Sequence, residues 1–259
     1  KEMLLRCQDR GEMLLEMVKD LLYLSRHDSN RLNLEIRANE IFTVIGPANS
    51  GKTTFLHALN RLIDLSPNSR TSGEIRLDGV DIRRGLEVED LRRKVGIVFA
   101  LPLPLPISIY ENVVYGLRMQ GRRDARFLDE AVERSLQESY LWEEVKDRLR
   151  TPAMNLSGGQ QQRLCMARIL AGQPDVLLFD EPTSGLDPIS TARIEETMLN
   201  LKEKYTIVLV TNNVAQAARV GERTAFFLMG DLVEVSATSK MFTTPADNRT
   251  SDYITGKFG

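Results

Sequence analysis

The sequence predicts an α/β fold in which a phosphate-binding loop joins a buried strand to a helix. Residues 41–45 form an apolar run typical of a buried strand, and residues 54–62 carry apolar residues at helical spacing. Between them, residues 46–53 fit the pattern G-x-x-x-x-G-K-[ST], in the strand, loop and helix context that this pattern requires. Further apolar runs at 95–99, 176–179 and 206–211 indicate more buried strands of the same core.

The loop is chemically suited to hold a phosphate chain. Its glycines let successive backbone N–H groups turn toward an anion, and the N-terminus of the following helix adds partial positive charge. Lys52 is expected to hold the β- and γ-phosphates, and the Thr53 hydroxyl to ligate Mg²⁺. A chance match in a surface turn is the alternative, and the motifs further along the chain make it untenable. The predicted nucleotide-binding residues here are Gly46, Pro47, Ala48, Asn49, Ser50, Gly51, Lys52, Thr53 and Thr54.

The composition is that of an ordinary soluble protein. Among 259 residues, 42% are apolar and 27% charged, and 34 Lys and Arg against 36 Asp and Glu give a formal charge of −2. This balance gives no support for a nucleic-acid-binding surface, so no nucleic acid partner is expected. Cys7 and Cys165 lie far apart without metal-ligand spacing, which favours reduced cytosolic thiols over a disulfide or zinc site. Because no apolar stretch approaches the roughly 18 to 20 residues of a membrane span and no signal peptide is recognisable, a membrane role is expected to need a partner.

The segments around the phosphate loop predict an antiparallel β subdomain. Runs at 14–24 and 31–37, split by a polar turn, are predicted to be antiparallel strands that lead into the loop strand. Tyr23 could stack on a nucleotide base or fill a strand face, and composition favours neither alternative. Residues 71–79 are predicted to form a short strand between turns, and residues 225–235 a hairpin.

A small helical lobe is predicted over residues 102–155. Alternating prolines at 102, 104 and 106 forbid a helix and favour extended backbone, so residues 101–106 are expected to be a stiff connector. The following segments at 108–118, 124–138 and 141–149 have helical periodicity. The chain is therefore predicted to be a single domain over 1–259, with a core and β subdomain over 12–101 and 156–259 and an inserted lobe over 102–155.

Two later segments place polar groups at the ends of predicted elements. Residues 156–160 (Leu-Ser-Gly-Gly-Gln), here called the Ser-Gly segment, precede a helix predicted over 161–171 and offer N–H groups to an anion. Taken alone, the segment is better explained as an ordinary N-cap with a flexible turn. The strand predicted from residue 176 ends in Asp180 and Glu181, where one carboxylate can hold Mg²⁺ through water and the next can take a proton from an attacking water. A tight turn at 184–187 adds Asp187 before a helix predicted over 188–205.

With residues 46–53, 156–160, 176–181 and 184–187 in this order, the chain resembles the ATP-binding cassette family from about residue 14 onward. Residues 108–112, 216–219 and 249–259 look like the ATPase subunits of bacterial phosphate importers. The resemblance implies a P-loop NTPase (RecA-like) core that uses ATP and Mg²⁺ and forms a head-to-tail homodimer with ATP. It also implies a peripheral location on the cytoplasmic face of the inner membrane. There the lobe and connector would receive a transmembrane permease and, through it, a solute-binding protein.

The resemblance also assigns roles to individual residues. Lys52 and Thr53 of one subunit would hold the phosphates and the metal, with Asp180 assisting Mg²⁺. Glu181 would be the general base, and Asn212 occupies the position of a second catalytic group that contacts the γ-phosphate. The remaining nucleotide contacts would come from Tyr23 on adenine, Asp187 at the dimer seam, and Ser157, Gly158, Gly159 and Gln160 of the other subunit.

The sequence departs from the family at three positions. Asn49 replaces a glycine of the loop, which is mild because Asn tolerates left-handed backbone. Ala100 replaces a Gln that contacts the metal and the attacking water and links the site to the lobe; alanine can do neither. Asn212 replaces a His, so that a hydrogen-bond donor remains but with shorter reach and no titratable proton.

The resemblance and the departures from it leave two possible functions, which belong to different classes of protein. The first is an ATPase that energises an importer, with inorganic phosphate as the favoured solute and slow hydrolysis as an expected consequence of Ala100 and Asn212. The second is a switch or regulatory subunit that closes on ATP and hydrolyses little. Soluble cassette proteins of DNA repair or translation are disfavoured, because they carry long coiled coils or two cassettes in one chain.

Overall fold

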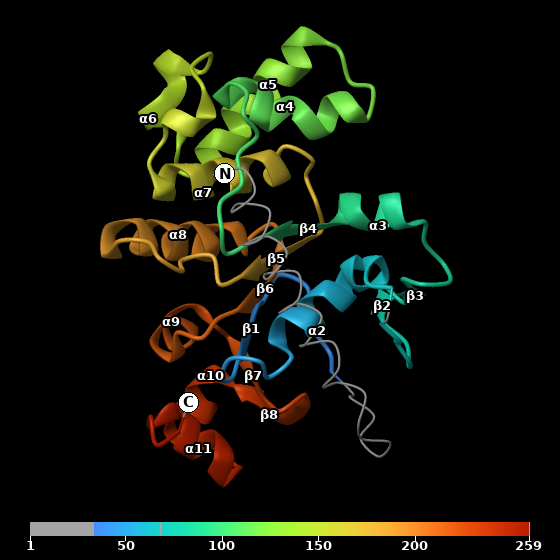
Figure 1. The fold of residues 1–259 in the computed structure, drawn as a ribbon, viewed down its shortest axis with the longest axis vertical. Coiled ribbons are helices and arrows are strands. Elements are labelled where there is room, and N and C mark those ends of the chain that lie inside the picture. The colour runs from blue at the N-terminus through green and yellow to red at the C-terminus, as the bar shows by residue number, and fades with distance from the viewer. Residues whose placement is uncertain (1–33, 68, 259) are drawn as a thin grey trace, which may run out of the picture.

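The computed structural model describes residues 34–67 and 69–258, built around a six-stranded sheet (Figure 1). The strand order is β4-β5-β6-β1-β7-β8, in which neighbouring strands are parallel except for the antiparallel pair β7 and β8. This last pair confirms the predicted hairpin, and its turn places Met229 and Gly230 at positive φ, as hairpin turns require. The strands are β1 (Ile41–Ile45), β4 (Val95–Val98), β5 (Val176–Asp180), β6 (Thr206–Val210), β7 (Arg223–Leu228) and β8 (Asp231–Ala237).

Helices cover both faces of this sheet, which is why its strands read as continuous apolar runs. Successive strand residues face opposite sides: Ile41 packs in a cluster with α7 and α8, whereas Phe42 packs in a cluster with α2 and α3. The α/β fold class is confirmed. The helices around the sheet are α2 (Lys52–Leu59), α3 (Val88–Lys94), α7 (Gly158–Leu170), α8 (Pro188–Leu201) and α9 (Val214–Val220).

The remaining helices lie at the two ends of the molecule in Figure 1. At one end α4 (Ile109–Met119), α5 (Ala125–Glu138) and α6 (Trp142–Val145) pack with α7, followed by 3-10 turns Lys146–Arg148 and Ala153–Asn155. Side chains of Ser108 and Asp124 cap α4 and α5 by accepting a backbone N–H. At the other end lie α10 (Thr238–Thr243) and α11 (Asn248–Ile254). The boundaries of the lobe at 102 and 155 stay a prediction.

The proline connector at 101–106 has no helical residues, and one buried asparagine anchors it to the helix that follows. The Asn112 side chain accepts the Leu105 N–H at 2.8 Å and donates to the carbonyls of Leu105 at 3.1 Å and Ser108 at 2.9 Å. Arg168 of α7 also donates to the connector, to the Leu103 carbonyl at 3.2 Å. The extended segment is therefore fixed by hydrogen bonds as well as by its prolines.

Several expectations need correction or lie beyond the described residues. The strand predicted over 14–24 and Tyr23 lie outside them, and the described part of the 31–37 run, residues 34–37, is not a strand. The short strand predicted near 75 is half of an antiparallel pair, β2 (Arg76–Leu77) with β3 (Val80–Asp81). Helix α7 begins at Gly158 and not at residue 161, because Ser157 already caps it. In the described part of the chain, no helix has the length and apolarity needed to cross a membrane.

Candidate nucleotide-binding site

The phosphate loop, residues 46–53, runs from the end of β1 to the first turn of α2. Asn49 and Gly51 have φ angles of 59° and 93°, so the asparagine occupies the left-handed conformation that it tolerates better than other non-glycine residues. A Cβ atom at Gly46 would lie 2.2 Å from the Phe227 carbonyl oxygen on β7. Glycine is therefore required at position 46 by close backbone approach.

The interior of the loop fits a chain of phosphates. Lys52 Nζ donates to the carbonyls of Gly46 at 2.9 Å and Pro47 at 2.7 Å, so the loop holds its own cation within the curve of its backbone. Helix α2 has no side-chain cap and no acidic residue in its first turn, which leaves its N-terminal N–H groups for an anion. Within the described residues the buried Ser50 hydroxyl has no hydrogen-bond partner, and an anion in the loop would supply one.

The neighbouring strand brings oxygen ligands to the same place. Thr53 Oγ1 donates to Asp180 Oδ1 at 3.1 Å, and Asp180 ends β5 with 8% of its surface exposed. Carboxyl ends of parallel strands meet at one edge of a sheet, so a loop after β1 and a carboxylate after β5 face one another. Hydroxyl and carboxylate oxygens are ligands that Mg²⁺ prefers, so this pair fits a magnesium ion shared with phosphate oxygens.

Glu181 and Asn212 stand side by side at this edge. The Asn212 amide donates to Glu181 Oε1, and the Glu181 N–H bonds to the Val210 carbonyl at 2.8 Å. The Thr211 N–H bonds to the Val44 carbonyl at 3.1 Å, which ties the end of β6 to the end of β1. Glu181 has φ 44°, an uncommon conformation for a non-glycine residue. The structure therefore brings Thr53, Asp180, Glu181 and Asn212 together with the phosphate loop.

Ala100 follows β4 at the same sheet edge, and its methyl group offers no polar contact. The contact with α7 is made instead by the preceding backbone, since Gln162 Nε2 donates to the Phe99 carbonyl at 2.8 Å. The Gln162 side chain is buried, and its bond joins α7 to the residue that follows β4.

A partly buried polar network near the site was not predicted from the sequence. Gln216 of α9 donates to Thr183 Oγ1 at 3.0 Å and to Glu195 Oε1 at 3.2 Å. Arg219, one turn later, donates twice to Glu195, at 2.8 and 2.6 Å. The network links the loop after Glu181 to the helix after Asn212. The available signal was a pair of polar residues three positions apart on an otherwise apolar helix, but their partner on α8 is distant in sequence.

Tyr253 of α11 supports the phosphate loop from behind. Its ring stacks on Phe226 of β7 with centroids 5.0 Å apart, and Phe226 pairs with Ile45, the residue before the loop. Burial raises the pKa of Tyr253, the Gly46 N–H beside its hydroxyl opposes that rise, and the charge of Glu181 adds to it. Sequence alone gave this residue no role.

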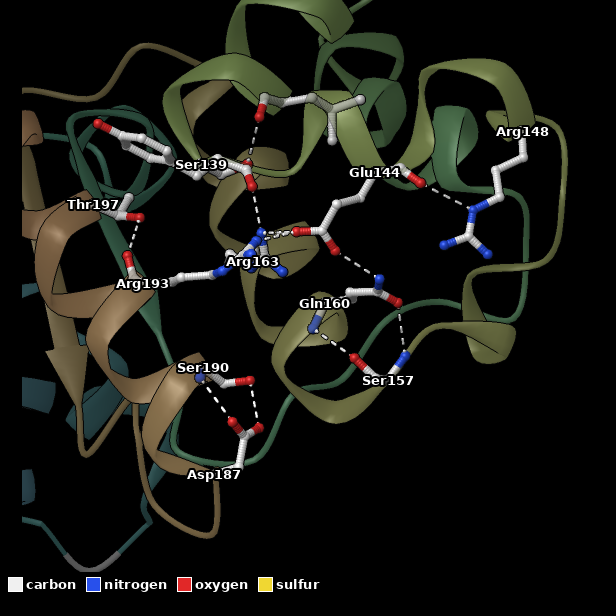
Figure 2. A network of polar contacts seen from close by, with 12 residues as sticks. Ser139, Glu144, Arg148, Ser157, Gln160, Arg163, Asp187, Ser190, Arg193 and Thr197 are labelled. Carbon is white, nitrogen blue, oxygen red and sulfur yellow. Dashed lines mark hydrogen bonds and ion pairs between the residues drawn. The ribbon is translucent and has the colours of Figure 1, made fainter.

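The Ser-Gly segment caps α7, as the simpler alternative for it predicted. Ser157 and Gln160 form a capping box: the Ser157 hydroxyl accepts the Gln160 N–H at 3.4 Å, and the Gln160 side chain accepts the Ser157 N–H at 3.0 Å. Gly159 approaches α8 so closely that a Cβ would fall 2.4 Å from Ser190 Oγ. Figure 2 shows the capping box close to the start of α8, where Asp187 caps the helix by accepting the Ser190 N–H at 3.0 Å. The hydrogen bond from the Ser190 hydroxyl lowers the pKa of Asp187.

Fold and site together define a nucleotide-binding ATPase domain of the P-loop class. The chain belongs to the ABC transporter family, whose model matches residues 29–184, more than half of the chain.

Solved structures agree with this assignment. The ATP-binding cassette MJ0796, solved as a dimer in a post-hydrolysis state bound to ADP and Pi, is 28% identical over 81% of this chain and 90% of its own, with a TM-score of 0.68. The cbiO1 protein from Clostridium perfringens, part of the ABC transporter complex cbiONQ, shares the fold at 24% identity over 85% of this chain and 86% of its own, with a TM-score of 0.71. A bacterial Atm1-family ABC exporter with ATP bound also shares it, at 23% identity over 87% of this chain and 38% of its own, with a TM-score of 0.71.

Proposed function

We propose that this chain is the ATP-binding and ATP-hydrolysing subunit of an importer of inorganic phosphate, working as an ATP-dependent homodimer. The observation that carries the ATPase proposal is the convergence of Lys52, Thr53, Asp180, Glu181 and Asn212 at one end of one sheet. The similarity to a cassette solved as a dimer with ADP and Pi supports the dimer.

Each side chain has a task that its position supports. Lys52 places a positive charge inside the phosphate loop, and Thr53 with Asp180 would hold Mg²⁺, which neutralises phosphate charge when bound. Glu181 has one carboxylate oxygen occupied by the Asn212 amide and keeps the other to accept a proton from water. Asn212 orients the base and offers its amide to the γ-phosphate, in place of the family's histidine.

The permease is proposed to dock in a groove between α3, α4, α7 and the proline connector. Three apolar side chains in or beside the connector, Phe99, Leu101 and Leu103, line the groove and are 41%, 57% and 54% exposed. Arg92, Arg93 and Arg168 also line it, so a short apolar segment carrying carboxylates would match both features. The connector is fixed on its inner side by Asn112, which gives the partner a rigid surface.

Hydrolysis is tested by the Mg²⁺-dependent release of phosphate from ATP by the purified chain, with Glu181→Gln as the inactive comparison. The proposed solute is tested in cells that lack this chain. Uptake of radiolabelled phosphate should fall while sulfate uptake is unchanged, and the wild-type chain should restore it where Lys52→Ala does not. Unchanged phosphate uptake would remove the solute assignment and leave the ATPase assignment intact. The support for phosphate is the similarity of residues 108–112, 216–219 and 249–259 to phosphate-importer subunits.

A second candidate is an ATP-dependent switch with little hydrolysis, and a specific observation favours it. Ala100 contributes no polar group to the site, and one of the two amide hydrogens of Asn212 is already used by Glu181. ATP turnover measured with and without the permease separates the two candidates: a switch stays slow in both conditions, whereas an importer subunit is accelerated by its permease.

A further inference from the structure

One carboxylate outside the site, Glu144 of α6, collects three donors from two other helices (Figure 2). Its Oε2 accepts the side-chain amide of Gln160 at 2.7 Å. Its Oε1 accepts a guanidinium N–H of Arg163 at 2.8 Å and another from Arg193 of α8. The first two donors belong to α7 and the third to α8. A single side chain of the lobe therefore joins the start of α7 to α8.

The charges around Glu144 make its carboxylate necessary. Two guanidinium groups meet one carboxylate, and the Arg163 side chain is only 4% exposed. Burial raises the pKa of Glu144, but the hydrogen bonds from Arg163 and Gln160 outweigh this and hold the pKa below its usual value, so the group is ionised at neutral pH. Without the carboxylate, the buried Arg163 guanidinium would lose its charge partner, and the half-exposed Arg193 of α8 would lose its link to α6 and α7.

The first of these donors, Gln160, connects Glu144 directly to the capping box. The Gln160 side chain uses its oxygen to accept the Ser157 N–H at 3.0 Å and its nitrogen to donate to Glu144. Glu144 thus fixes which way the Gln160 amide faces, and through it the conformation of Ser157. Gly159 of the segment packs against Ser190 of α8 with no room even for a Cβ atom. A shift of α7 relative to α8 would therefore displace the Ser-Gly segment.

We propose that Glu144 is a positioning residue for the Ser-Gly segment, holding it in the orientation in which it covers the nucleotide of the partner subunit. The inference rests on the proposed dimer, in which each ATP lies between the phosphate loop of one subunit and the Ser-Gly segment of the other. Glu144 then acts on the nucleotide of the partner subunit, without touching it. Loss of Glu144 should leave nucleotide binding by its own phosphate loop intact.

The direct test replaces Glu144 by Ala and by Gln. Turnover should fall by about tenfold in Glu144→Ala, because the misplaced segment no longer completes the site, while the affinity of the monomer for ATP stays as in wild type. Glu144→Gln keeps the shape of the side chain but not its charge, so its turnover should lie between those of wild type and Glu144→Ala. The matched control is Glu143→Ala, which removes the neighbouring carboxylate of the same helix, paired with Lys146 and 76% exposed, and should leave both quantities unchanged. Wild-type turnover in Glu144→Ala would overturn the proposal, and so would weakened monomer binding of ATP in Glu144→Gln.

Mixing two impaired chains tests the action across the dimer. In a mixture of Glu144→Ala with Lys52→Ala, each heterodimer contains one site with an intact phosphate loop from the first chain and an intact Ser-Gly segment from the second. ATPase activity should rise well above that of either variant alone, and to the same level as in a reference mixture of Ser157→Arg with Lys52→Ala. Recovery in the reference mixture only would overturn the proposal for Glu144. Recovery in neither mixture would overturn the shared site of the proposed dimer, and the role of Glu144 with it.

Discussion

Lys52 is the residue on which we expect nucleotide binding to depend most. It is buried, and its ammonium group already lies against the loop carbonyls of Gly46 and Pro47, so binding requires only that phosphate oxygens join that cation. We expect Lys52→Ala to abolish Mg²⁺-ATP binding in titration calorimetry. The control is Lys94→Ala, an exposed lysine paired with Asp175, which should bind ATP as wild type does. Unchanged affinity in Lys52→Ala would remove the loop from its assigned role.

We expect Ala100 and Asn212 to determine how fast the site hydrolyses ATP. Phosphoryl transfer to water depends on positioning, and a positioned general base contributes roughly 10²–10⁴-fold. We expect slow hydrolysis in the unaltered protein with ATP affinity preserved. The double change Ala100→Gln and Asn212→His should raise turnover by more than the product of the single changes, because both groups act on one γ-phosphate.

The comparison for this experiment is the unaltered chain, measured with saturating Mg²⁺-ATP. If it already hydrolyses ATP as fast as the double variant, the Asn212 contact with Glu181 is sufficient to position the base. The switch function would then be abandoned in favour of an ordinary importer ATPase.

Among single residues, those that belong to a local sequence motif could be predicted from the sequence. The phosphate loop, Asp180 and Glu181 were predictable because each is fixed by its place after a buried strand, and the structure brings them together. Glu144, Gln216 and Tyr253 were not predictable, because each acts through a partner that is distant in sequence. Their residue types alone do not distinguish a buried contact from a solvated one.

Helix α9 and the loop after β5 are coupled by one side chain. Gln216 is fully buried and reaches both Thr183 and Glu195. In Gln216→Leu the half-buried Thr183 hydroxyl and the Glu195 carboxylate each lose a hydrogen bond, and one such bond contributes about 0.5–1.5 kcal/mol to stability. We expect urea unfolding to report that loss, together with lowered turnover because the loop after Glu181 is released. The same substitution at exposed Gln137 of α5 should alter neither, and equal effects at both positions would contradict this role for Gln216.

For helices and strands, the presence of an element was easier to predict than its first and last residues. The strands were recognisable as apolar runs bounded by turns, and β7 with β8 as a hairpin. The start of α7 was misplaced because the two glycines after Ser157 look like a turn, whereas the reciprocal hydrogen bonds of Ser157 and Gln160 already begin the helix there. The position of β1 between β6 and β7 could not be derived from periodicity, since it depends on crossovers between distant segments.

For the whole molecule, the proposed shared site predicts nucleotide-dependent association. Acidic Asp180 and Glu181 oppose a second triphosphate-bearing surface until Lys52 and Mg²⁺ offset the charge. We expect a monomer without nucleotide, and an ATP-bound dimer in Glu181→Gln, where hydrolysis no longer reopens it. Analytical ultracentrifugation measures both states. A dimer that forms regardless of ATP, or none in Glu181→Gln with ATP, would contradict a site completed by the partner.

Global stability should fall in mild acid because of His57 on α2. Its Nε2 is buried without a partner among the described residues, and its ring meets Phe99 edge-on at 6.3 Å. Burial lowers the pKa of His57 below 6.5, so as pH falls through 6.5 the unfolded chain takes up a proton that the folded chain resists. The free energy of unfolding should therefore decrease below that pH. Urea unfolding of His57→Leu should show a smaller decrease between pH 7.5 and pH 5.5, and an identical decrease would contradict this assignment.

The central place of β1 also determines when the site can exist during synthesis. Ile41 pairs with Ile207 and Phe42 with Arg223, so the strand that carries the phosphate loop leaves the ribosome long before either of its neighbours. Until β6 and β7 emerge, the backbone groups of β1 lack their sheet partners and the loop lacks the Phe227 carbonyl against which Gly46 is packed. The nascent chain consequently has to keep an apolar strand from aggregating until β6 and β7 have been made, and ATP can stabilise the folded domain only after that point.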